Sequence, residues 1–386
     1  MRILHIAPSI ARSYGGPTQS LSGYIISARL AGADVTVAAP AASPAETAEM
    51  ESATGPGRVH TFSSFGRGAF VLSPSMVQWV RTAARKHDVV HVHGLFNPVS
   101  TLSCRAAIQE GAAVVLRPFG TLSRYTFEHR RNRLKRAYFG ALERFNVDRA
   151  SALHFTTSFE RNEATWHNID FGHRAHVVPP PWIGATTPVV HSAGDPVVLF
   201  IGRINRVKNI EALLSAWPRI LLGHHEARLV IAGSGDSRYL ASLRDTVTQL
   251  GISNRVFFPG FIDAEQKAEA LGAATVLVLP SHHENFGVVV LEAIAAGIPV
   301  VVSPKVQIAD FVHDNDFGIV TESSPPELAS AINFALSDRA LQHRVRELGH
   351  ARVAETFAPE IIGKQLEQMY LRAIETRNAR TSGIQN

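Results

Sequence analysis

The chain is organised around one polar loop that lies between two apolar segments. A short apolar run, VLVL, ends at Pro280, and the segment 281–297 that follows reads SHHENFGVVVLEAIAAG. A second apolar run occupies residues 298–302. Strand, loop, helix and strand in this order predict a βαβ unit of a parallel sheet. The loop then opens at the carboxyl edge of the sheet, where open α/β sheets bind their ligands.

This loop carries groups that suit both an anion and hydroxyls. Gly287 lets the backbone turn into the helix, which leaves the N–H groups of Val288 and Val289 as first-turn donors for an anion. The carboxylates of Glu284 and Glu292 instead accept hydrogen bonds from hydroxyls, as on a ribose or a hexose. A sugar nucleotide has hydroxyls at both ends and phosphates between them. For either glutamate alone, a solvated surface position is the more common role.

The combined motif is more specific than its parts. The sequence ENFG from Glu284, four further residues, and EAIAAGIPVV from Glu292 resemble the signature of the retaining family 4 glycosyltransferases, of the bacterial group 1 type. The resemblance implies the GT-B fold, an α/β architecture in which two Rossmann-like domains face each other across a cleft and a C-terminal helix crosses back to the first domain. It also implies transfer of a hexose from a nucleoside diphosphate sugar to a hydroxyl of a glycan or lipid-linked acceptor.

Length and composition agree with two domains. A chain of 386 residues with 45% hydrophobic residues can form two ordinary cores, and 18% charged residues argue against disorder. We expect an N-terminal acceptor-side domain over residues 1–180, a Pro/Gly/Ala-rich linker over 181–196 and a nucleotide-sugar-binding domain over 197–362. A crossover helix and tail are expected over 363–386.

Several features bear on location and partners. The single cysteine, Cys104, excludes an internal disulfide and fits a reducing cytoplasm. No apolar run approaches the length of a membrane span, and the opening segment is too short and broken for a signal peptide. We therefore expect a cytoplasmic protein, and peripheral contact with the inner face of the membrane is one of the alternatives for the basic segment described below. The net charge of +5 is compatible with nucleic acid, anionic lipid or phosphorylated substrates, and composition does not choose among them.

Two strand ends of the N-terminal half carry candidate donor contacts. Gly15 and Gly16 follow the first strand, where a plain βα turn and a ligand loop are equally consistent with the spacing. Alternation places His91 and His93 on one face of a later strand, where a lone histidine is more often a core residue than a catalyst. The resemblance implies that the glycine loop lies by the donor phosphates and that His93 faces the donor sugar. This histidine pair has no cysteine or nearby carboxylate, so no metal site is predicted.

Two further N-terminal segments concern the acceptor. Phe119 stands where many relatives of the family have histidine, so the family's acceptor role is not carried over to this loop. Residues 124–149 resemble an amphipathic basic helix, which would contact an anionic membrane or grip an acceptor diphosphate. A solvated face is equally consistent, because Glu128, Glu143 and Asp148 dilute the charge. Nucleic acid is disfavoured, since no aromatic platform or zinc finger accompanies the segment.

A basic turn begins the second α/β series. Segment 202–209, GRINRVKN, follows the strand at 197–201, and cations at such a turn complement a diphosphate. The match to the family's phosphate-clamping turn covers Arg203 and Lys208. A Gly-Ser-Gly at 233–235 lacks the third glycine of the dinucleotide fingerprint, because Arg238 stands in its place. We therefore expect a tight turn near the nucleotide and no NAD.

The resemblance implies a role for each candidate residue. Arg203, Lys208, the glycine loop and the N–H groups at the start of the helix would neutralise the departing diphosphate. Glu292 would bind the ribose, and Glu284 would bind the hexose together with the backbone of Asn285, Phe286 and Gly287. No cofactor and no metal are expected. The alternatives are another GT-B sugar-nucleotide enzyme of the 2-epimerase type and a non-catalytic sugar-nucleotide-binding protein. A role in surface polysaccharide biosynthesis is expected by resemblance only.

Overall fold

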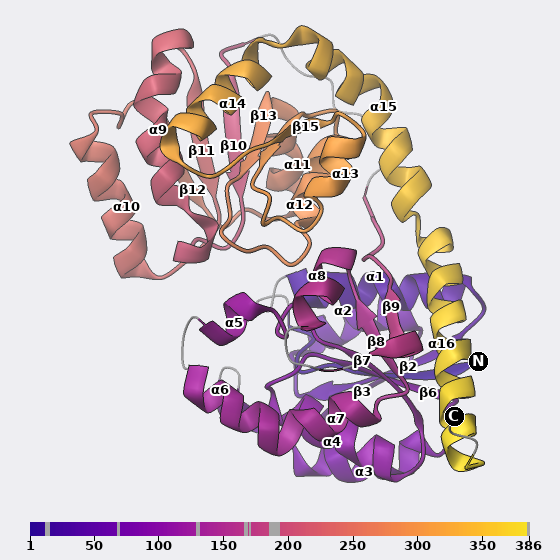
Figure 1. Ribbon diagram of the computed structural model, residues 1–386. Coiled ribbons are helices and arrows are strands. Elements are labelled where there is room, and N and C mark those ends of the chain that lie inside the picture. The colour runs from indigo at the N-terminus through magenta and orange to yellow at the C-terminus, as the bar shows by residue number, and fades with distance from the viewer. Residues whose placement is uncertain are drawn as a thin grey trace. The chain divides into compact units, whose positions relative to one another are not determined.

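The chain forms two compact units (Figure 1). The computed structural model describes residues 1–11, 16–67, 70–128, 132–165, 169, 171–184 and 194–383. Unit 1 comprises Met1–Ile183 and Phe357–Asn386, and unit 2 comprises Gly184–Thr356. The expected linker contains the first boundary, although residues 185–193 lie outside the described residues. The C-terminal boundary lies before the whole last helix rather than at residue 363, because this helix packs on unit 1 along its length.

Unit 1 is built on a seven-stranded parallel sheet with the order β3-β2-β1-β6-β7-β8-β9. Its strands are near-continuous apolar runs, as expected for a parallel sheet covered on both faces. The strand order reverses between β1 and β6, which makes this position the topological switch point of the unit. The strands are β1 (Arg2–Ile6), β2 (Asp34–Pro40), β3 (Val59–Phe62), β6 (Val89–His93), β7 (Ala113–Arg117), β8 (Ala152–Phe155) and β9 (Ala175–Val177), beside a hairpin of β4 (Phe65–Arg67) and β5 (Phe70–Leu72).

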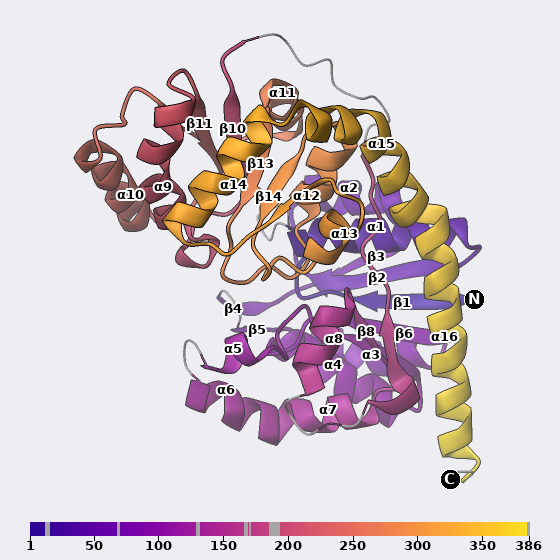
Figure 2. The ribbon, with the colours of Figure 1, turned by 45° about the horizontal axis from the view of Figure 1, so that its top comes forward.

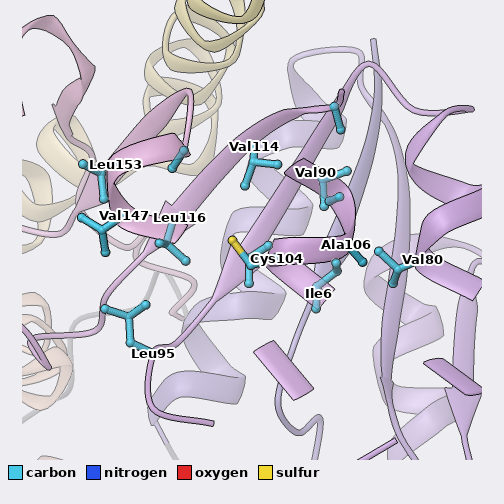
Figure 3. Packing of buried hydrophobic residues seen from close by; sticks show 14 of the residues in the cluster. Ile6, Val80, Val90, Leu95, Cys104, Ala106, Val114, Leu116, Val147 and Leu153 are labelled. Atoms are coloured by element: carbon cyan, nitrogen blue, oxygen red, sulfur yellow. The ribbon is translucent and has the colours of Figure 1, made fainter. Parts of the chain in front are cut away.

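Helices cover both faces of this sheet (Figure 2). On one face, α1 (Gly16–Leu30) packs against α16 (Pro359–Thr381), and α16 also contacts β6, β7 and β8. On the other face, α3 (Pro74–Ala84) and α4 (Pro98–Gln109) cover an apolar cluster that includes Cys104, shown in Figure 3. Alternation along the strands divides the side chains accordingly, so that odd positions of β1 and β6 face α1 and α16.

The remaining helices of unit 1 lie between the sheet strands in sequence. They are α2 (Pro44–Thr54), α5 (Arg124–Glu128), α6 (Asn132–Tyr138), a π-helical turn (Phe139–Glu143), α7 (Arg144–Arg149), α8 (Ser158–Ala164) and a 3-10 turn (Gly172–Arg174).

The basic segment 124–149 is not one continuous amphipathic helix. Residues 129–131 lie outside the described residues, and the described parts are divided among α5, α6, the π-helical turn and α7. Glu143, which the sequence counted with the solvated charges, is fully buried. Its carboxylate accepts hydrogen bonds from the Phe96 N–H at 2.7 Å and the Thr101 hydroxyl at 2.6 Å. The end of the π-helical turn therefore faces the protein interior. There Glu143 holds the loop after β6 through its hydrogen bond to Phe96.

Unit 2 contains a six-stranded parallel sheet with the order β12-β11-β10-β13-β14-β15. The predicted βαβ unit is confirmed: β13 leads through α12 to β14, and the two strands pair in parallel. The strand order reverses between β10 and β13. The elements are β10 (Val197–Ile201), α9 (Ile210–Gly223), β11 (Arg228–Ala232), α10 (Ser237–Gln249), β12 (Val256–Gly260), α11 (Ala264–Ala273), β13 (Val276–Leu279), α12 (Val288–Ala295), β14 (Val300–Val302), α13 (Ala309–Asp314), β15 (Gly318–Val320), α14 (Pro325–Ser337) and α15 (Arg339–Phe357).

Among the described residues, no helix has the length and apolar character needed to cross a membrane.

Candidate functional site

The signature loop after β13 is fixed by its neighbours in unit 2. The Glu284 N–H donates to the Lys305 carbonyl at 3.0 Å, and the Gln307 N–H donates to the Glu284 carbonyl at 3.2 Å. Gly287 has φ of 89°, and a Cβ there would lie 3.0 Å from a methyl carbon of Val306. Both the left-handed backbone and the close packing favour glycine. The predicted turn into α12 is therefore present, and the helix begins at Val288.

The basic turn after β10 lies directly beside this loop. The Lys208 ammonium donates to the Glu284 carboxylate in an ion pair, and the side chains are 15% and 20% exposed. The His282 N–H donates to the Val207 carbonyl at 2.8 Å. The ends of β10 and β13 are thereby joined at the switch point of unit 2. The structure thus brings together two of the predicted site residues, Lys208 and Glu284.

Glu292 is also paired with a lysine. Lys267 on α11 donates to Oε1 of Glu292 on α12 at 2.6 Å, and the side chains are 28% and 16% exposed. Lys267 was not among the predicted site residues, because nothing in the chain order relates a lysine on one helix to a glutamate on the next. The pair orients the carboxylate that the sequence assigned to a ribose.

The Gly-Ser-Gly at 233–235 packs against the basic turn. The Ile204 N–H donates to the Ser234 carbonyl at 2.8 Å. A Cβ on Gly233 would collide with the Gly202 carbonyl oxygen, and one on Gly235 would collide with that of Ile204. The expected tight turn is confirmed, and the glycines are explained by close backbone approach.

The other predicted donor residues differ in exposure. Arg203 is exposed at the start of the basic turn. Asn285, Val288 and Val289 are partly exposed, whereas Phe286 is buried with 6% of its surface exposed. Burial of Phe286 indicates that its ring packs in the fold.

Unit 1 places His93 at its own switch point. His91 and His93 lie on one face as predicted, with ring centroids 4.3 Å apart. His93 is 1% exposed, and its Nε2 lies 2.8 Å from Nδ1 of His5 on β1. His5 was not among the predicted site residues, although side chains alternate along β1 and His5 pairs in register with His91. Gly16 begins α1, and Gly15 lies outside the described residues.

Two further residues complete this buried histidine cluster. The Tyr370 hydroxyl lies 2.9 Å from Nδ1 of His91, and Nε2 of His91 lies 3.2 Å from Nδ1 of His154. Nε2 of His154 lies 2.7 Å from the Val178 carbonyl oxygen. The carbonyl can only accept, so a neutral His154 donates from Nε2 and accepts at Nδ1. His91 then donates from Nε2, and Tyr370 donates to its Nδ1.

A buried arginine lies beside the cluster. The Arg117 guanidinium lies 4.5 Å from the ring centre of Tyr24 and 4.0 Å from that of Phe119, and it donates to the Ser20 hydroxyl at 3.2 Å. Burial, and then the charge of Arg117, lower the pKa of His5 to about 3. Burial and the neighbouring charges also hold the pKa of His93 well below its ordinary value. The imidazoles are therefore neutral at neutral pH.

Three histidines of the cluster lie close enough together to be compared with a metal site. His5, His91 and His93 each offer a ring nitrogen, and these atoms lie within 4.8 Å of one another. Both nitrogens of His91 are already hydrogen-bonded, and the Arg117 charge acts on all three rings. A divalent cation beside a buried guanidinium, with no carboxylate ligand, is electrostatically unfavourable. These residues do not fit a metal.

Buried glutamates hold the loops at the carboxyl edge of this sheet. Phe96 and Phe119 both have left-handed backbones, with φ of 59° and 57°. Glu143 binds the N–H of Phe96, and Glu160 accepts from the Gly120 N–H at 2.5 Å. A charge-assisted hydrogen bond to the backbone keeps each strained loop in place. Neither contact has a signal in the sequence, because each joins residues at least 40 positions apart.

The two Rossmann-like parallel sheets, each in its own compact unit, give the chain the architecture of a GT-B protein. Two family models support a narrower assignment. Residues 15–181 match the glycosyl transferase 4-like domain, and residues 188–352 match the glycosyl transferases group 1. The chain belongs to the group 1 glycosyltransferases, as the sequence motif predicted.

Curated relatives match part of the chain. An uncharacterized glycosyltransferase of Methanocaldococcus jannaschii is 37% identical over 182 residues, which are 47% of this chain and 46% of that protein. The alpha-monoglucosyldiacylglycerol synthase of Streptococcus pneumoniae is 31% identical over 187 residues, 48% of this chain and 41% of that protein. The chain thus spans about half the length of the curated relatives it matches.

Solved structures match almost the whole chain. HepE of Anabaena, crystallised with UDP and glucose, superposes with a TM-score of 0.76 at 20% identity, covering 95% of this chain and 98% of that one. At this identity the likeness establishes the fold.

Proposed function

We propose that the chain is a retaining glycosyltransferase that moves a hexose from a nucleoside diphosphate sugar to a hydroxyl of a glycan or lipid-linked acceptor. The observation that carries the proposal is the Lys208–Glu284 pair at the switch point of unit 2. This edge of an open α/β sheet is where ligands bind. A cation for phosphate and a carboxylate for hydroxyls adjoin each other there, as a sugar nucleotide requires. HepE, which shares the fold, was crystallised with UDP and glucose.

Some of the candidate residues stabilise charge in this reaction, and others orient the sugar. Lys208, Arg203 and the N–H groups of Val288 and Val289 stabilise the negative charge that develops on the departing diphosphate. Lys208 exchanges part of its pairing with Glu284 for this phosphate. The freed carboxylate then accepts hydrogen bonds from hexose hydroxyls, which fixes the sugar ring for attack.

The other candidate residues bind and orient the two ends of the donor. Glu292 accepts from the ribose hydroxyls while Lys267 holds its Oε1. His93 of unit 1 hydrogen-bonds the hexose near the bond that breaks. Retention without an assigned protein nucleophile corresponds to attack on the face that the diphosphate leaves, with the diphosphate as the base.

The nucleobase end of the donor has a candidate contact in Phe261. This side chain follows β12 and is 75% exposed, so it is not part of the core. An exposed aromatic ring at the carboxyl edge of the sheet offers a stacking surface for a base. Phe261 follows β12, which pairs with β11. The turn after β11 packs against the basic turn that carries Lys208.

The acceptor side of the proposal rests on the basic segment of unit 1. Arg133, Leu134 and Arg136 are exposed on α6, and Leu134 is 55% exposed. Cations beside an exposed apolar side chain suit an anionic bilayer surface or a lipid-linked diphosphate. One relative is named for the synthesis of a glucosylated diacylglycerol, which supports a lipid acceptor. We extend the proposal to surface polysaccharide or glycolipid synthesis at the inner face of the membrane.

A donor panel followed by one substitution tests the proposal. Thermal shifts with UDP, GDP, ADP and their sugars identify the donor, because a ligand that binds only the folded state raises the melting temperature. Release of the nucleoside diphosphate in the presence of extracted lipids or glycans then measures transfer. Lys208→Met should lower turnover by about a hundredfold or more, as expected when one transition-state charge donor is lost.

The control is Lys364→Met, which removes an exposed lysine of α16. Turnover of Lys208→Met within a few-fold of this control would contradict the assignment. Conversion of the donor sugar without an acceptor would indicate an epimerase instead. Donor binding without conversion or transfer, across all extracts, would indicate a non-catalytic binding protein.

A further inference from the structure

We propose that His5 is a positioning residue for His93: it fixes the tautomer and the ring orientation with which His93 meets the substrate. The two rings belong to β1 and β6, the strands on either side of the switch point of unit 1. Nδ1 of His5 lies 2.8 Å from Nε2 of His93, and both residues are buried, at 0% and 1% exposure. This inference rests on the proposed role of His93 in sugar transfer.

The rest of the cluster shows why this pair stands apart. The chain from Tyr370 through His91 and His154 ends on the Val178 carbonyl, so every ring nitrogen of His91 and His154 has a partner. In contrast, Nε2 of His5 and Nδ1 of His93 are buried and have no hydrogen-bond partner among the residues that the structure describes. Buried polar atoms are nearly always hydrogen-bonded, and an exception calls for an explanation. A structural histidine network would have satisfied these atoms as it satisfies those of His91 and His154.

The proton count couples the two unpartnered atoms. Each neutral imidazole carries one ring proton, and the 2.8 Å contact uses one proton for its hydrogen bond. The outer nitrogens therefore have opposite character: one is an N–H donor and the other is a lone-pair acceptor. The ring of His5 thereby decides whether Nδ1 of His93 donates to a sugar oxygen or accepts from a sugar hydroxyl.

A partly buried aromatic side chain lies beside His93. The Phe119 ring centroid lies 6.0 Å from that of His93, and Phe119 is only partly buried. Phe119 packs beside the His93 ring, and the contact with His5 holds the imidazole in one orientation for a sugar that reaches Nδ1. The role of His5 is therefore preorganisation of the ring.

Three substitutions of His5 separate positioning from packing. His5→Asn places an amide near the position of Nδ1, which makes the bond to His93, whereas His5→Gln places its amide near Nε2, which does not. His5→Leu removes both. His5→Asn should retain kcat within a few-fold of the parent, while His5→Gln and His5→Leu should lose about tenfold or more with an unchanged donor KM. His154→Asn is the matched control. It should lower the melting temperature but leave kcat unchanged when kcat is measured below that temperature.

The spectrum of His93 gives an independent readout. Long-range ¹⁵N–¹H correlation spectra of histidine-labelled protein distinguish Nδ1–H from Nε2–H tautomers. One tautomer is expected for His93 in the parent and in His5→Asn, and an exchange-averaged or inverted one in His5→Gln and His5→Leu. Should His5→Leu fail to fold, the comparison of His5→Asn with His5→Gln carries the same test.

Equal kcat in all three variants, or an unchanged His93 spectrum in His5→Gln, would overturn the inference. Failure of the proposed function looks different. In that case the parent transfers no sugar to any acceptor, while the tautomer of His93 still responds to His5→Gln.

Discussion

Acid should unfold unit 1 through its buried histidines. Four of them, His5, His91, His93 and His154, are at most 1% exposed, and burial is the first cause that lowers the pKa of each below 6.5. In the unfolded chain these groups titrate near their ordinary pKa. The unfolded state therefore binds protons that the folded state excludes, and the free energy of unfolding falls as the pH falls below 6.5.

The magnitude follows from the difference in bound protons. At pH 5.5, one unit below the ordinary pKa, each excluded proton costs about 1.4 kcal/mol, and at pH 7.5 it costs almost nothing. Four such rings amount to about 5 kcal/mol over this range, which is as large as the whole stability of many domains. Glu143 acts in the opposite direction: burial raises its pKa, so the folded state gains that proton first and offsets part of the loss.

Urea unfolding at pH 7.5, 6.5 and 5.5, followed by circular dichroism, measures the total effect. Hydrogen exchange with mass spectrometry assigns it, because peptides from β1, β6 and β8 should lose protection in acid before those from β10 and β13. His154→Asn should reduce the pH dependence by about a quarter. His225→Gln, which changes a side chain that is 85% exposed, should leave it unchanged. A change of less than about 1 kcal/mol in unit 1 between pH 7.5 and 5.5 would refute the reasoning.

Three other predictions concern single contacts. Gly233→Ala should destabilise unit 2 by several kcal/mol more than Gly251→Ala in chemical unfolding. Both positions have positive φ, but only a Cβ on Gly233 would clash with the Gly202 carbonyl. Similar losses in the two variants would show that this clash does not determine the cost. Glu160→Ala should lower the free energy of unfolding of unit 1 by about 3 kcal/mol, since the Gly120 and Thr156 N–H groups lose a buried acceptor. Phe261→Ala should weaken nucleotide binding in calorimetry by about tenfold and leave stability unchanged, whereas unchanged affinity would exclude base stacking.

Much of the fold could be predicted because the strands are apolar runs of fixed period. The segment around Glu284 contains strand, glycine turn and helix in one continuous stretch, so sequence order alone gives their arrangement. The glycines at 233 and 235 were recognised as a turn for the same local reason.

The contacts that sequence reasoning missed all join residues far apart in the chain. His5 is 88 positions from His93, and Lys267 is 25 positions from Glu292. Each depends on which strands or helices become neighbours, and that is decided by the crossover at the switch point. The buried carboxylate of Glu143 was assigned to the surface because a charged residue in a basic segment has no local mark of burial. The sequence identified the residues that carry charge but not the residues that orient them.

The departure at Phe119 also has a physical explanation that its sequence position did not offer. Arg117 is buried, and its guanidinium is held by the rings of Phe119 and Tyr24 and by the hydroxyl of Ser20. An aromatic ring stabilises a buried cation through its quadrupole without adding a titratable group. A histidine at position 119 would add a further ionisable ring next to the guanidinium, and its protonated form would repel that charge. Phe119 thus packs on Arg117 without adding a titratable group beside the neighbouring imidazoles.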